Sequence, residues 1–65
     1  MYNPDLERNF YRRNSRKSSD ELKKIISARQ ALLPVLKGSQ ADPILAEIEA
    51  SKKILIERGD MQPEE

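Results

Sequence analysis

The sequence predicts an all-α protein built on an antiparallel helical hairpin, with helices at about residues 19–37 and 43–58. In both segments apolar residues recur at spacings of three and four, which is typical of amphipathic helices. Asp42-Pro43 is a strong helix-start signal between the two segments. No segment alternates apolar and polar residues as a strand does. The apolar positions are Leu22, Ile25, Ile26, Leu32, Leu33 and Leu36 in the first helix, and Ile44, Leu45, Ile48, Ile54 and Leu55 in the second.

The first helix has a clear start and an ambiguous end. Ser18 and Glu21 form a capping-box pattern, in which the hydroxyl and the carboxylate each satisfy a terminal amide. Pro34 removes one amide and clashes with the carbonyl four residues earlier. The helix therefore either kinks near Pro34 and runs to residue 37, or ends near Leu33 with a terminal turn. We expect the kink, because Leu36 still falls on the apolar stripe.

The second helix is bounded by residues with strong terminal preferences. Asp42 is expected to cap its first turn and Pro43 to take its first position. Gly59 supplies the left-handed residue that ends many helices. Residues 60–65 form an acidic tail that we expect to be disordered.

The first seventeen residues form a separate segment of different character. Asn3 is expected to cap a short helix that begins with Pro4, and Tyr2, Leu6 and Phe10 recur at a spacing of four. A helix of about ten residues is not stable alone in water, so it must dock or stay frayed. The predicted organisation is an N-terminal segment (1–17), a hairpin (18–59) and a tail (60–65).

The hairpin carries more apolar surface than two helices can cover. On the second helix, Leu45 and Ile56 lie to one side of the main stripe and Ile54 to the other. Three outcomes satisfy this excess: the N-terminal segment docks as a third helix, two hairpins dimerise into a four-helix bundle, or a partner protein covers the surface. Dimerisation is the expected outcome, because small helical chains commonly form symmetric dimers.

Polar residues interrupt each apolar stripe near its middle. Arg29 occupies the centre of the first stripe and Ser51 the facing position of the second. One interpretation is that the Arg29 stem covers apolar surface while its guanidinium reaches water or Glu47. The other is a buried polar layer with Ser51 that fixes register and association state. The carboxylates Glu47, Glu49 and Glu57 are expected on exposed helix faces.

Two surfaces are candidates for binding. The predicted protein interface consists of Arg29, Leu45, Ser51, Ile54 and Ile56. The second surface is the basic stretch at residues 8–17, which holds five of the twelve basic residues and no acidic one. Its candidate nucleic-acid contacts are Arg8, Phe10, Tyr11, Arg12, Arg13, Arg16 and Lys17. Basic residues neutralise phosphates and aromatic rings stack on unpaired bases, so the pattern suits RNA especially. The alternative is a solvated linker whose aromatic residues pack on the hairpin.

Composition narrows the function classes. The chain has no Cys and no His, and no constellation of nucleophile and base, so we expect no catalysis, no cofactor and no metal. No apolar run is long enough for a membrane span and none resembles a signal peptide, which predicts a cytoplasmic protein. The expected function is a small regulator, inhibitor or adaptor that binds a larger protein, of a kind frequent among phage and accessory proteins. The alternatives are a nucleic-acid binder on a hairpin-dimer scaffold and a structural subunit of a larger assembly.

Overall fold

The computed structural model describes residues 4–62, and this part of the chain is all-helical, as predicted. Three α-helices lie within it: α1 (Pro4–Asn14), α2 (Ser19–Leu32) and α3 (Ala41–Arg58). Two short 3-10 turns, Leu33–Val35 and Gly38–Gln40, connect α2 to α3. Within the described residues, no helix is both long and apolar enough to cross a membrane.

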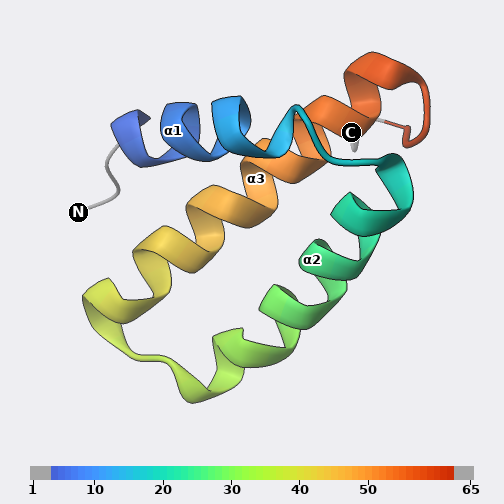
Figure 1. Cartoon of the computed structure of the whole chain (residues 1–65). Helices are drawn as coiled ribbons and strands as arrows, with labels where there is room; N and C mark the ends of the chain where they lie inside the picture. The colour runs from blue at the N-terminus through green and yellow to red at the C-terminus, as the bar shows by residue number, and fades with distance from the viewer. Residues whose placement is uncertain (1–3, 63–65) are drawn as a thin grey trace.

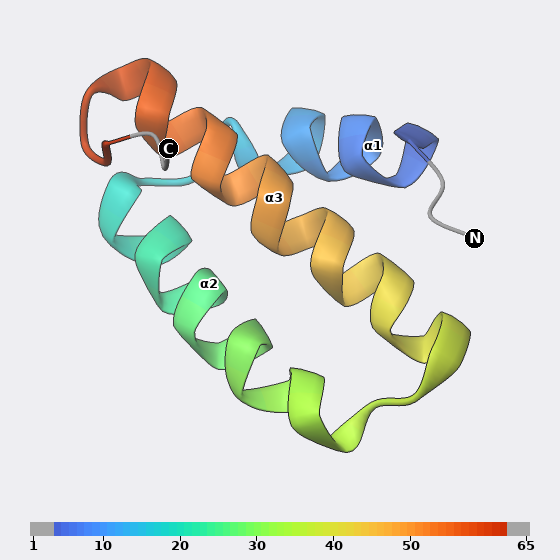
Figure 2. The same cartoon turned by 180° about the vertical axis from the view of Figure 1, so that it is seen from behind.

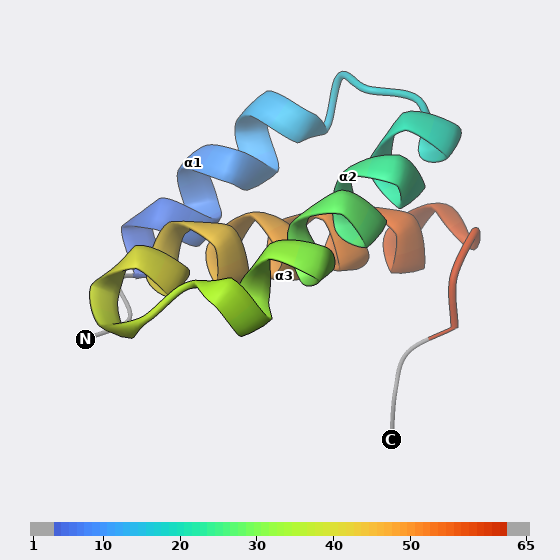
Figure 3. The same cartoon turned by 90° about the horizontal axis from the view of Figure 1, so that it is seen from below.

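Helix α3 is the centre of the arrangement. It runs antiparallel to α2, as the hairpin predicts, and α1 crosses its C-terminal half (Figure 1). The reverse view shows the same crossing (Figure 2), and from below both α1 and α2 are seen against α3 (Figure 3). The N-terminal segment is therefore docked as a third helix. Of the three predicted arrangements that cover the excess apolar surface, docking of the N-terminal segment is the one that a single chain shows.

The predicted N-terminal helix is confirmed over Pro4–Asn14. Asp5 and Glu7 lie in its first turn and Arg12 and Arg13 in its last, the order that the helix dipole favours. Its predicted cap Asn3, and Tyr2 of the apolar edge, lie outside the described residues.

Helix α2 begins as expected. Ser18 has extended backbone angles, and its hydroxyl oxygen accepts a hydrogen bond from the Glu21 amide at 3.2 Å. Lys17 forms an ion pair with Glu21 at 3.5 Å, one turn along the chain. The N-cap half of the predicted capping box is confirmed.

The predicted kinked continuation of this helix to residue 37 is not found. Helix α2 ends at Leu32, and the chain tightens into a 3-10 turn that contains Pro34 before Leu36 becomes extended. Proline has no amide to donate to the Gln30 carbonyl, which accepts instead from Leu33, one position earlier. The shorter bond narrows the last turn, so Pro34 terminates the α-helix.

Helix α3 begins two residues earlier than predicted, and Asp42 is not its N-cap. Gln40 occupies the cap position, with no hydrogen bond from its side chain to the helix end. Asp42 and Pro43 lie inside the first turn, where a negative charge is favoured and a missing amide costs little. The end matches prediction: Gly59 has φ 80°, and the amides of Gly59 and Asp60 bond to the carbonyls of Ile56 and Leu55.

The core joins all three helices. Its buried aliphatic residues are Leu22, Ile26, Ile48, Ile54 and Leu55, with Tyr11, Ile25, Leu33, Ile44 and Met61 packed around them. Met61 belongs to the segment predicted to be a disordered tail, but its side chain packs on this core. Residues 63–65 lie outside the described residues.

The left-handed backbone at Gly59 gives a direct test of the α3 terminus. A Cβ at this position meets no atom within 4 Å, so the cost of Gly59→Ala is conformational and not steric crowding. We expect it to lower the free energy of unfolding by about 1 kcal/mol, and Gly59→Asn by less, because Asn tolerates this conformation. Urea denaturation followed by circular dichroism measures both, and equal stability of all three proteins would contradict this reading of the terminus.

Candidate functional site

A buried network of polar side chains links the three helices. The Nδ2 atom of Asn14, at the end of α1, donates to Ser51 Oγ at 3.1 Å and to Glu47 Oε2 at 3.5 Å. Glu47 Oε1 accepts from Nε of Arg29 on α2 at 2.8 Å. Asn14 and Ser51 are completely buried and Glu47 is 8% exposed. One α3 carboxylate therefore receives hydrogen bonds from both neighbouring helices.

The amide orientation of Asn14 follows from the charge beside it. Its NH2 group faces the Glu47 carboxylate, whereas the opposite orientation would place two oxygens together. This choice leaves Asn14 Oδ1 buried with no hydrogen-bond partner. A buried acceptor without a hydrogen-bond partner destabilises the folded state. This cost offsets part of the stabilisation that the hydrogen bonds of the network provide.

Arg29 and Ser51 belong to this network but do not bond to each other. The first interpretation of Arg29 is confirmed: it pairs with Glu47, and its side chain stays 40% exposed. Ser51 is paired with Asn14 of α1 instead. The expected exposure of Glu47 was wrong, because its carboxylate lies between Arg29 and Asn14.

Sequence reasoning missed the part that Asn14 takes in this network, because residues 14–18 are polar and without a repeating pattern. A signal was present: the spacing of four that relates Leu6 and Phe10 extends to Asn14. That spacing places all three on one edge of α1. Because Asn14 is polar, it was not counted among the buried residues of this edge.

A second group of polar contacts fastens α1 and the following loop to the end of α3. The Tyr11 hydroxyl donates to the Glu57 carboxylate, and Lys53 lies 3.9 Å from Glu7. Arg58 Nη2 donates to the Ser15 carbonyl at 2.8 Å. The hydrogen bond to Glu57, reinforced by partial burial and the carboxylate charge, raises the pKa of Tyr11 above its ordinary value. These contacts fix the orientation of α1 about its own axis.

With one edge of α1 held in this way, its arginines face solvent. Arg8, Arg12 and Arg13 of α1 are exposed, and so is Arg16 in the turn that follows the helix. We call these four residues the arginine face. Lys17 is half-buried and paired with Glu21, so it lies apart from this set.

The two aromatic residues of the basic stretch lie differently from the arginines. The Tyr11 ring packs against the core and its hydroxyl bonds to Glu57. Phe10 is half-buried, with the Arg13 guanidinium 5.6 Å from its ring centre. The expectation that these aromatics pack on the rest of the fold is supported for Tyr11.

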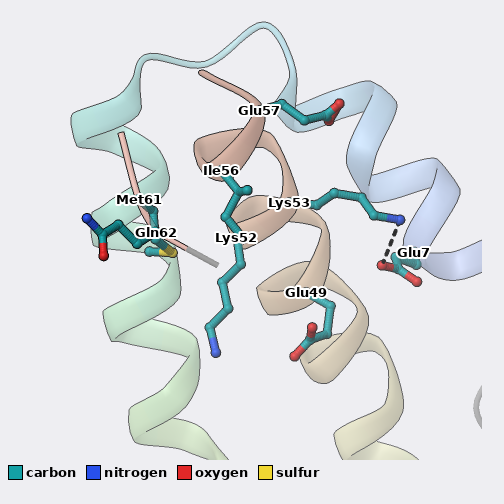
Figure 4. A pocket seen from close by; sticks show the side chains of 8 residues that line it. All are labelled: Glu7, Glu49, Lys52, Lys53, Ile56, Glu57, Met61 and Gln62. Carbon is teal, nitrogen blue, oxygen red and sulfur yellow. Dashed lines mark ion pairs between the residues drawn. The ribbon is translucent and has the colours of Figure 1, made fainter. Parts of the chain in front are cut away.

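Surface grooves lie along these helices in the part of the chain that the structure describes. One of about 780 Å³ runs along the arginine face and is lined without any acidic residue, by Asn9, Tyr11, Arg12, Arg13, Ser15 and Arg16. A second, of about 820 Å³, mixes arginines with Glu7 and Glu57. The third, of about 400 Å³, lies where α3 meets Met61 (Figure 4). Its lysines and glutamates alternate around Ile56, so it has no single charge character.

The predicted apolar anchors are distributed unevenly. Ile54 is 4% exposed and belongs to the core, and Ser51 is completely buried, so neither is presented on the surface of this fold. Ile56 is half-buried in the third groove, whereas Leu45 is 38% exposed. The interface role of Arg29, Leu45 and Ile56 stays a prediction.

No protein-family model, curated protein or solved structure matches this chain. Within residues 4–62, no cluster of three or more acidic side chains is arranged to hold a metal ion.

The buried network predicts that Asn14 matters more than its polarity suggests. Asn14→Ala leaves Ser51 and Glu47 without their shared donor and opens a small cavity, so we expect a loss of about 2 kcal/mol of unfolding free energy. Asn9→Ala makes the same change at an exposed position of α1 and is expected to change stability by less than about 0.5 kcal/mol. Equal effects of the two substitutions in thermal denaturation would refute a structural role for the network.

Proposed function

We propose that the protein acts by association, as a small non-enzymatic binding module or adaptor, and that the arginine face of α1 contacts an anionic macromolecule. The observation that carries the proposal is the concentration of exposed arginines at one docked helix: Arg8, Arg12 and Arg13 on α1, and Arg16 in the turn directly after it. No acidic residue interrupts residues 8–17. Four like charges held close together favour a ligand of opposite charge.

The rigid docking of α1 supports this proposal. Asn14 and Tyr11 hold its inner edge on α3, so Arg8, Arg12 and Arg13 are presented by a helix that need not fold on binding. Arg16 follows directly after this helix. Guanidinium groups make bidentate contacts with carboxylate and phosphate groups. A surface organised before binding loses less conformational freedom when its partner arrives.

The absence of catalysis remains part of the proposal. The buried polar groups of Asn14, Glu47 and Ser51 and the half-exposed Arg29 are joined by hydrogen bonds across the helix interfaces. This arrangement suits a structural role, because the groups are occupied with holding the helices together. A catalytic group must instead reach a substrate atom.

A charge-matched pair of variants tests the arginine face. The triple variant Arg8→Gln, Arg12→Gln, Arg16→Gln removes three charges from it, while Lys23→Gln, Lys24→Gln, Lys37→Gln removes three exposed charges elsewhere. On heparin, a generic polyanion, we expect the arginine variant to bind about tenfold more weakly than the lysine variant. Binding is measured by isothermal titration at low salt, with circular dichroism as the control for folding.

Equal weakening in the two variants would mean that only net charge matters, and the proposed surface would be wrong. No binding of the unmodified protein to heparin would remove the proposal altogether.

A second candidate function is association through apolar residues with a larger protein or with a second copy of the chain. Val35 is 71% exposed, and Leu32 and Leu45 are each exposed by more than a third. All three lie near the turns that join α2 to α3. This observation favours the dimer or the partner complex expected from the sequence, although α1 takes up part of the apolar surface that motivated it.

Sedimentation equilibrium tests the homodimer form of this candidate. A dimer that uses the closed end of the hairpin predicts a doubled mass at micromolar concentration and a shift to monomer in Val35→Ser. A folded monomer for the unmodified protein over this range would exclude the homodimer.

A further inference from the structure

We propose that the arginine face binds the phosphate backbone of double-stranded nucleic acid, in a mode that uses charge and hydrogen bonds without base stacking. This inference rests on the proposed function and names the partner of the same surface. It also reverses one expectation from the sequence, in which interleaved aromatic residues favoured unpaired RNA bases. The reversal comes from where the fold places Tyr11 and Phe10.

Tyr11 is half-buried and attached to the rest of the fold at both ends of its side chain. Its ring packs on the core cluster, and its hydroxyl donates to Glu57 of α3. A base can reach only the part of the Tyr11 ring that the core leaves uncovered. Tyr11 therefore serves as an anchor of α1 on α3.

The Phe10 ring is not freely available for base stacking either. It is half-buried, and the Arg13 guanidinium lies 5.6 Å from the ring centre. A cation so close to the ring is attracted by its π-electrons. The same contact holds Arg13 on the surface, where its remaining donors can face a phosphate.

The groove along this surface has the chemistry of a phosphate site. Arg12, Arg13 and Arg16 line it together with the Asn9 side chain, and no carboxylate does. From Arg8 to Arg13 the helical rise of α1 spans about 7.5 Å, and Arg16 follows in the turn after the helix. Arginines spread over this distance can contact more than one phosphate of a duplex at once.

Single-stranded and double-stranded nucleic acids are bound through different kinds of contact with a protein. Single strands are usually bound by a basic groove together with aromatic rings on which bases stack. Double-stranded DNA needs no such rings and presents about one charge per 1.7 Å of its length. Since the fold supplies the arginines and occupies the rings, the duplex is the partner that fits.

Fluorescence anisotropy with a labelled duplex, and with one of its strands alone, tests the inference across a range of salt concentrations. We expect tighter binding to the duplex and a linear fall of log K with log salt. The Arg8, Arg12, Arg16 triple variant should flatten the slope by about 2.7, or about 0.9 for each lost phosphate contact. The Lys23, Lys24, Lys37 variant should keep the slope of the unmodified protein. A duplex RNA of the same sequence distinguishes DNA from RNA as the source of the phosphates.

Phe10→Leu provides the discriminating control, since it removes an aromatic ring without removing charge. Duplex affinity should change by less than about twofold in this variant, because phosphate contacts set it. Tighter binding to the single strand, or a large loss on Phe10→Leu in a protein that remains folded, would overturn the inference. Arginine-dependent heparin binding with no binding to either nucleic acid would overturn it too, while leaving the proposed function standing.

Discussion

The buried hydrogen bonds from Asn14 of α1 to Glu47 and Ser51 of α3 are the interaction on which the rest of this structure depends. An eleven-residue helix is too short to persist alone in water, so it exists because it docks. Arg29 of α2 bonds to the other oxygen of the same carboxylate, which ties the two sides of α3 to one charged group. Breaking this centre would release α1 and expose the surface that it covers.

Several features of the surface follow from this docking. With Asn14 and Tyr11 bonded to α3, Arg8 and Arg12 of α1 face solvent, and Arg13 lies exposed beside the Phe10 ring. Helix α1 also covers part of the apolar surface from which dimerisation was predicted. The protein was expected to associate through apolar residues of the hairpin, but the fold instead places a basic helix at the surface.

The sequence predicted the elements better than their contacts. Helical periodicity located all three helices, and Ser18 and Gly59 marked termini that the structure confirms. Pro34 was recognised as disruptive, but the choice between a kink and an end depends on whether the Gln30 carbonyl finds another donor, which it does in Leu33. Glu47 was expected to be exposed because it is charged, and the polar Asn14 was not recognised as buried. Their burial depends on a partner distant in sequence, which a periodicity argument does not reveal.

Hydrogen exchange of the backbone amides, followed by NMR, tests the central claim most directly. If the buried network fixes α1 on α3, the amides from Phe10 to Asn14 should be protected to nearly the same degree as those in the middle of α3. Asn14→Ala should reduce the protection in α1 more than in α2. Exchange of the α1 amides at rates typical of an isolated peptide, with α2 and α3 still protected, would contradict the account.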